Sequence, residues 1–234
     1  MKRILSLIEY FNKTEIVLWI SSIIGIVVSY CIFDGSSMIT LVASLIGVTS
    51  ILLNAKGNPI GQALMIVFSI LYGYISFSFA YYGEMITYLG MTMPMAVIAL
   101  VSWLRHPYKG KKIEVAVNRL GKKEVFFMLV LSGAVTVVFY FLLWNFNTAN
   151  IIPSTLSVTT SFIAVYLTFR RSPYFSLAYA FNDTVLLVLW TLASFENIKY
   201  ISVVVCFTAF LINDIYAFIS WKKMEKRQTI HYES

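Results

Sequence analysis

The sequence predicts an all-α polytopic membrane protein with eight transmembrane helices. Of its 234 residues, 59% are hydrophobic and only 12% are charged, whereas soluble domains carry roughly 25% charged residues. The apolar residues form eight long runs, and the basic residues fall almost entirely in alternate gaps between those runs. Both patterns are typical of a chain that crosses a bilayer repeatedly.

Each apolar run is long enough to cross a hydrocarbon core about 30 Å thick, which needs roughly 20 helical residues. No convincing small-residue cleavage site follows the first run, so we interpret it as a retained helix rather than a signal peptide.

Pro94 predicts a kink inside the fourth run, because proline donates no backbone hydrogen bond. Six runs contain no charge beyond their first residue, and the last two each contain one aspartate, Asp183 and Asp214. In chain order the runs are 15–33, 37–54, 60–79, 85–104, 125–144, 152–169, 174–195 and 199–221.

The basic residues predict that both termini lie in the cytoplasm, because cytoplasmic loops retain positive charge. With the N-terminus inside, 17 of the 18 Lys and Arg residues fall in cytoplasmic segments, and only Lys199 falls outside. The net charge of +7 is therefore explained by topology in the plasma membrane and does not indicate nucleic-acid binding. The cytoplasmic segments are 1–14, 55–59, 105–124, 170–173 and 222–234, and the outer loops hold Asp34, Glu84 and Glu196.

Two matched pairs of residues indicate an internal repeat. Pro59 and Pro173 are 114 residues apart, and Trp103 and Trp221 are 118 apart, each pair in similar surroundings. Two three-helix units run parallel only if one more helix joins them. We therefore predict one leading helix and a 3+1+3 bundle of parallel repeats, a transporter plan that binds solute between its halves. The divisions are 1–36 (tail and extra helix), 37–104 (first repeat), 105–151 (basic loop and linker helix), 152–221 (second repeat) and 222–234 (basic tail).

Asn182 and Asp183 interrupt the seventh run within a stripe of side chains spaced three or four residues apart. Side chains with that spacing lie on one face of a helix. Asp183 is roughly 14 Å from the inner end at 1.5 Å per residue. A central aspartate costs about 2.5–3.5 kcal/mol to insert, and such residues usually face a cavity or a partner. Aromatic rings beside an amide and a carboxylate suit a flat ligand with hydroxyl groups or positive charge. The stripe is Phe175, Tyr179, Asn182, Asp183, Leu186 and Trp190.

Other candidate cavity residues are Asn213 and Tyr216 in the last run and Tyr72 in the third. The position of Gln62 is compatible with two roles, an amide that lines the cavity or a helix cap at the membrane interface. The opposing interpretation is that Asn182 and Asp183 only join helices, an interaction of about 0.6 kcal/mol. The tryptophans Trp103 and Trp221 are expected in the inner aromatic belt, and Tyr81 in the outer one. The complete candidate set for solute binding is Asn182, Asp183, Tyr179, Phe175, Trp190, Asn213, Tyr216, Gln62 and Tyr72.

The sequence does not indicate an enzyme, a cofactor or a metal site. It contains no G-x-S-x-G or H-E-x-x-H motif, and neither histidine lies in an apolar run. Cys31 and Cys206 lie in apolar runs without the spacing of metal ligands or a disulfide, so we expect small core residues. A carrier coupled to protons, in which Asp183 titrates, stays open because a buried carboxyl group can change protonation.

Residues 40–222 resemble the PnuC family of vitamin transporters, which shares the three-one-three plan with the SWEET sugar carriers. The resemblance is carried by LLNAKGNPIGQ, ILYGYISF and YYGEM in the first half, and by FRRSPY and YAFNDTVLLVLW in the second. Members typically show Trp-x-x-Trp-x-x-x-Asn on the central helix of the second half. Here Asn182 matches that pattern, but Phe175 and Ala178 occupy the tryptophan positions.

The resemblance implies a membrane transporter that takes up nicotinamide riboside, a precursor of NAD, by facilitated diffusion with alternating access. Thiamine and riboflavin, which relatives in this family carry, are the alternative substrates that the missing tryptophans leave open. The same resemblance implies a homotrimer, and it implies that a cytosolic kinase makes uptake directional by phosphorylating the vitamin.

Overall fold

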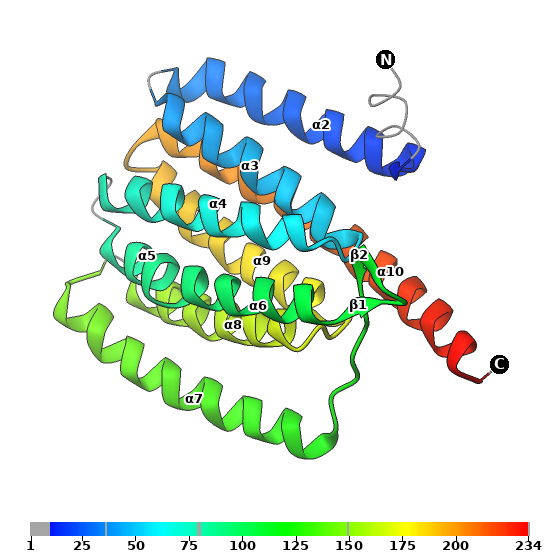
Figure 1. Cartoon of the computed structure of the whole chain (residues 1–234). Helices are drawn as coiled ribbons and strands as arrows, with labels where there is room; N and C mark the ends of the chain where they lie inside the picture. The colour runs from blue at the N-terminus through cyan, green and yellow to red at the C-terminus, as the bar shows by residue number, and fades with distance from the viewer. Residues whose placement is uncertain (1–9, 36, 79–80, 149, 234) are drawn as a thin grey trace.

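The computed structural model describes residues 10–35, 37–78, 81–148 and 150–233 (Figure 1). Within this part of the chain, eight helical segments are long and apolar enough to cross a membrane, which confirms the predicted fold class. The segments are α2 (Lys13–Ser29) with η1 (Tyr30–Asp34), α3 (Met38–Ala55), α4 (Pro59–Ser78), α5 (Tyr82–Thr87) with η2 (Tyr88–Thr92) and α6 (Met93–Arg105), α7 (Lys122–Asn145), α8 (Ile151–Phe169), α9 (Phe175–Ser194), and η3 (Ile198–Tyr200) with α10 (Ile201–Glu233).

The fourth span changes its helical geometry next to Pro94. The π-helical turn η2 separates α5 from α6, and Pro94 lies in the first turn of α6. A proline ring collides with the carbonyl four residues earlier and supplies no donor to it, and a wider turn accommodates both effects. Glu84 lies in α5 with 1% of its surface exposed, so its placement in an outer loop was wrong.

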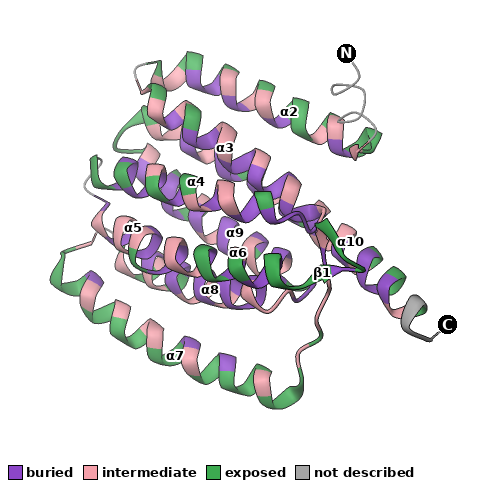
Figure 2. Ribbon diagram, in the orientation of Figure 1, coloured by how far each residue is buried: buried purple, intermediate pink, exposed green. Residues whose placement is uncertain are grey.

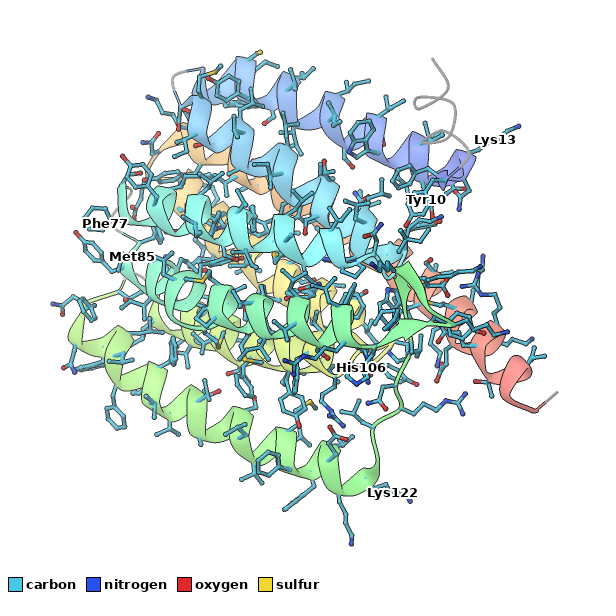
Figure 3. All side chains as sticks on the ribbon, viewed as in Figure 1. Tyr10, Lys13, Phe77, Met85, His106 and Lys122 are labelled. Carbon is cyan, nitrogen blue, oxygen red and sulfur yellow. The ribbon has the colours of Figure 1, made fainter. Side chains whose placement is uncertain are left out.

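Six helices form a closed ring through neighbouring contacts in the order α3, α4, α6, α8, α9 and α10, and α10 returns to α3. The third helix of each three-helix group therefore contacts the first helix of the other group. Helix α2 packs against α3 and α10, and α7 packs against α8 (Figure 1). Phe77 and Met85 lie at one end of the bundle, and Lys13, His106 and Lys122 lie at the opposite, basic end (Figure 3).

A small hairpin in the basic loop supports the last helix beyond the bundle. Strands β1 (Pro107–Tyr108) and β2 (Lys111–Val115) are antiparallel, and they were not predicted from the sequence. Helix α10 continues past residue 221, where the sequence predicted its span to end. Gln228 Nε2 donates to Glu114 Oε1 at 3.0 Å and to Val115 O at 3.1 Å, both in β2, and beyond the hairpin Arg119 contacts Glu225 at 2.8 Å. These contacts hold a charged stretch of helix that apolar burial alone would leave unsupported.

The surface pattern matches a bundle surrounded by lipid. Buried residues line the facing sides of the ring helices, whereas α7 is exposed along most of its length and few residues of α2 are buried (Figure 2). The exposed residues of α7 are largely apolar, including Phe126, Leu129 and Phe141. Large exposed apolar surfaces on a helix this long are stable in hydrocarbon and unfavourable in water.

A buried polar cluster attaches α2 to the ring near the basic end. Glu15 is 2% exposed, and its carboxylate lies 3.1 Å from Lys56 Nζ of α3 and accepts a 3.0 Å hydrogen bond from the Tyr216 hydroxyl of α10. Asn12 caps the helix by accepting from Glu15 N at 2.8 Å. Deeper along α2, Asn213 Nδ2 donates to Ser22 Oγ at 2.8 Å. Polar contacts therefore fix the position of a helix whose apolar faces give little specificity.

We expect Glu15→Gln to loosen α2, because the neutral amide loses the ion pair to Lys56 and part of its hydrogen bonding. Leaving buried polar partners unmatched costs about 1–3 kcal/mol, so the midpoint of thermal unfolding in detergent should fall by several degrees. Glu196→Gln, which neutralises an exposed carboxylate, is the matched control. Equal shifts for the two variants would show that the Glu15 cluster does not anchor the helix.

Candidate functional site

A small cavity lies at the centre of the six-helix ring. Its volume is ≈ 30 Å³, close to the volume of about one water molecule in the liquid. Five of the ring helices contribute to the lining, together with the π-helical turn η2 that precedes α6. The lining combines aromatic rings with one amide and two carboxyl groups. The lining residues are Ile51, Met65, Phe68, Tyr88, Thr92, Ser161, Tyr179, Asn182, Asp183, Phe207, Phe210 and Asp214.

The amide of Asn182 is oriented by hydroxyl groups of α8. Thr160 Oγ1 and Ser161 Oγ each lie 2.9 Å from Asn182 Oδ1, and Ser157 Oγ lies 3.5 Å from the same atom. Hydroxyl groups can donate to a carbonyl oxygen, so Oδ1 is directed toward α8. The Nδ2–H₂ group is then the part of the amide that can donate to a ligand. Tertiary contacts thus fix this side chain in one orientation.

Asp183 of α9 and Asp214 of α10 form a carboxyl pair in the cavity wall. The two side chains are in hydrogen-bonding contact, and their exposed fractions are 3% and 4%. Asp183 Oδ2 has no hydrogen-bond partner among the described residues. An ionised carboxylate only accepts hydrogen bonds, so contact between two carboxyl groups requires a proton on at least one of them. The pair therefore carries at most one negative charge, and Asp183 Oδ2 is an unused acceptor atom at the cavity.

Aromatic rings close the cavity on the side away from the basic end. The Tyr72 ring centroid lies 4.4 Å from that of Tyr88 and 5.6 Å from that of Phe207. Trp190 continues this layer with Tyr81 at 4.9 Å, although we expected Tyr81 in a lipid-facing belt. Tyr81 is only 6% exposed, so that expectation was wrong. Burial raises the pKa of its hydroxyl to about 12. We call Tyr72, Tyr81, Tyr88, Trp190, Tyr200 and Phe207 the outer aromatic layer.

Two tryptophans and Phe175 close the side toward the basic end. Trp103 Nε1 donates to Thr168 O of α8 at 2.9 Å, and Trp221 Nε1 donates to Asn54 O of α3 at 2.7 Å. The two indole rings lie 5.4 Å apart, and the Phe175 ring lies 4.8 Å from that of Trp221. Both tryptophans are fully buried, so their expected place in the inner aromatic belt was wrong. We call Trp103, Trp221 and Phe175 the inner tryptophan layer.

The nine sequence-predicted candidates fall into three groups. Three of them, Tyr179, Asn182 and Asp183, line the cavity. Tyr72, Trp190 and Phe175 lie in the two aromatic layers that close it. Gln62, Asn213 and Tyr216 contact neighbouring helices instead: Gln62 donates to Asn54 Oδ1 at 2.9 Å, and the other two contact α2. The cap of α4 is Asn58, which accepts from Ile60 N at 3.0 Å.

Several lining residues were not among the sequence-predicted candidates. Phe207 and Phe210 precede Asp214 by seven and four residues, so they share its helix face, and that spacing could have identified them. Ser161 could not be identified as a cavity residue from the sequence, because serine is compatible with many packing positions in an apolar helix. Tyr88 lies in the π-helical turn η2, where regular helical spacing no longer predicts direction.

Comparisons with known proteins identify the family. Residues 37–223 match the model of a family described as "Nicotinamide mononucleotide transporter". Nicotinamide riboside transporter PnuC of Neisseria mucosa is 24% identical over 217 residues, which cover 90% of this chain and 82% of that protein. A crystal structure of the vitamin B3 transporter PnuC shares the fold, with a TM-score of 0.82 and 22% identity over 93% of this chain and 94% of that chain. The chain belongs to the PnuC family of membrane transporters and is a transporter rather than an enzyme.

Proposed function

We propose that this protein takes up nicotinamide riboside across the plasma membrane, with both termini in the cytoplasm. The observation that carries the proposal is the central cavity, where the oriented Asn182 amide and the Asp183–Asp214 pair face aromatic rings. The amide and the carboxyl groups suit ribose hydroxyls, and the rings suit a flat cationic base. The name of the Neisseria mucosa relative supports the same solute.

The charge of the cavity favours the riboside over the mononucleotide. Nicotinamide mononucleotide carries a phosphate, and phosphate sites normally supply Arg or Lys side chains or helix N-termini. Among the described lining residues the ionisable groups are acidic, and none is Lys, Arg or His. A phosphate beside the Asp183–Asp214 pair would be repelled. Thiamine, which is also a cation, is the alternative substrate that this chemistry admits, and riboflavin lacks the positive charge.

Transport by alternating access requires both closing layers to separate in turn. The cavity of ≈ 30 Å³ is far smaller than the roughly 300–1,000 Å³ of small-molecule sites. The structure therefore has both sides closed around the site. Facilitated diffusion then consists of opening either the outer aromatic layer or the inner tryptophan layer.

We propose that segments 37–104 and 152–221 act as two parallel repeats in this motion. Trp103 of the first segment bonds Thr168 of the second, and Trp221 of the second bonds Asn54 of the first. The two tryptophans are 118 residues apart and the two acceptors 114, the same offsets as in the sequence pattern. Equivalent bonds crossing in both directions support a pseudo-twofold relation.

Phosphorylation in the cytosol would give this diffusive carrier a direction. A kinase that adds phosphate to the vitamin converts a cation into a solute that the acidic cavity repels, so the product does not return. The basic end, where the described part of the chain begins and ends at residues 10 and 233, is the cytoplasmic side in this proposal. Assembly as a homotrimer follows from the family resemblance, and the apolar surface of α7 is compatible with either lipid or a neighbouring subunit.

The test is calorimetric binding to the purified protein of nicotinamide riboside, its mononucleotide, thiamine and riboflavin. We expect nicotinamide riboside to bind and the mononucleotide to bind at least about 100-fold more weakly, because each 1.4 kcal/mol of repulsion is tenfold in affinity. Binding of thiamine alone would retain the cation cavity and correct the substrate. Tight binding of the mononucleotide would contradict the proposed charge of the site.

A further inference from the structure

The strongest unexplained feature of the cavity is a buried carboxyl group without a positive partner. Asp183 and Asp214 hold at least one proton between them, and Asp183 Oδ2 remains without a hydrogen-bond partner among the described residues. The other titratable groups that face Asp183 are Tyr88 of η2, Tyr179 of α9 and Cys206 of α10. None of them supplies a positive charge. An ionised carboxyl group in this pair therefore has no counterion among the described lining residues.

A buried carboxylate without a partner is costly near the centre of a membrane, so a ligand that neutralises it gains affinity. A hydroxyl group could satisfy Oδ2 as an acceptor but would leave the charge in place. A monocation satisfies both requirements, and the rings of Phe68, Tyr179 and Phe207 offer it further favourable contacts. The cavity is therefore suited to a ligand that carries one positive charge.

We propose that Asp183 is the residue that selects a singly charged cation over a neutral solute of the same shape. This inference rests on the proposed function, and it specifies that the site recognises the positive charge of the vitamin. Asn182 and the hydroxyl groups around it recognise hydrogen-bonding groups, which charged and neutral nucleosides share. Asp183 supplies the discrimination that those groups cannot supply, because its unpartnered oxygen belongs to a residue that lines the same cavity as Asn182.

The experiment compares nicotinamide riboside with its reduced dihydro form. The two ligands have the same ribose and carboxamide, but the pyridinium ring is positive and the dihydropyridine ring is neutral. Calorimetric Kd values are measured for both ligands on wild type, Asp183→Asn and Glu196→Gln. Wild type should prefer the cation by about tenfold or more. Asp183→Asn should lower that preference, because it keeps the shape of the side chain and removes the carboxyl group whose unpartnered oxygen lies at the cavity, while the carboxyl group of Asp214 remains. Glu196→Gln, which changes an exposed carboxylate, should retain the wild-type preference.

Each outcome separates the inference from the proposed function. Equal wild-type affinity for the two ligands overturns charge selection without the use of any variant, while the function stands. An unchanged preference in Asp183→Asn also overturns the inference, and that ratio is independent of the fraction of folded protein. If wild type binds neither ligand, the proposed function fails and the inference fails with it. A preference that is lowered only in Asp183→Asn supports the assignment.

Discussion

Asn182→Ala is expected to weaken nicotinamide riboside binding by about 10- to 100-fold, the largest effect of any single substitution in the cavity. The change removes the Nδ2–H₂ donor that faces the ligand. It also leaves Thr160 and Ser161, each 2.9 Å from Oδ1, without that acceptor. Lost buried hydrogen bonds of this kind cost about 1–3 kcal/mol. Calorimetry on the purified variant measures the effect directly.

The matched control for this substitution is Asn145→Ala on α7. Asn145 is exposed at the end of its helix, so its removal should leave the Kd unchanged. Thermal unfolding of both variants in detergent separates loss of the site from loss of the fold. If Asn182→Ala unfolds at a lower temperature but binds with wild-type affinity, Asn182 joins α8 to α9 and takes no part in recognition.

Trp221→Phe is expected to open the inner tryptophan layer. Phenylalanine keeps an aromatic ring but cannot donate to Asn54 O, which now accepts from Trp221 Nε1 at 2.7 Å. A hydrogen bond contributes about 0.5–1.5 kcal/mol, which favours the open state by roughly 3- to 10-fold. The double variant Trp103→Phe with Trp221→Phe should open further, because it removes both tryptophan hydrogen bonds that cross between the helix groups.

Cys206 offers a natural reporter for this opening. It is buried near Asp183, as expected for a core residue, whereas Cys31 is exposed, so its expected place in the core was wrong. In a Cys31→Ser background, the rate at which a polar thiol reagent labels Cys206 follows the open fraction. We expect roughly 3- to 10-fold faster labelling for Trp221→Phe. Trp144→Phe, which changes a tryptophan that is 61% exposed on α7, should label at the wild-type rate. An equal rate for Trp221→Phe would show that the tryptophan bonds do not hold the cavity closed.

The candidate site was only partly accessible to sequence reasoning. The cost of burying Asp183 in a membrane singled out the seventh helix, and three residues of its stripe line the cavity. The same criterion did not separate Asn213 from Asn182, because each is a buried amide in an apolar helix. Asn213 donates to Ser22 of α2, whereas Asn182 accepts from hydroxyl groups of α8. Only the identity of the neighbouring helix distinguishes these roles.

The sequence by itself determined that the chain crosses a membrane eight times. The length of each apolar run, compared with the bilayer thickness, and the distribution of basic residues can both be read along the sequence without knowledge of tertiary contacts. It also placed Pro94 at a break in the fourth span and Asp183 deep within the seventh. The tertiary structure alone decided that Trp103 and Trp221 meet in the interior, that α10 extends along a hairpin, and that Asp183 pairs with Asp214. Those features depend on which helix faces contact one another, and apolar helices can pack together through several different faces. Polar contacts between residues far apart in the sequence select one of these packing arrangements.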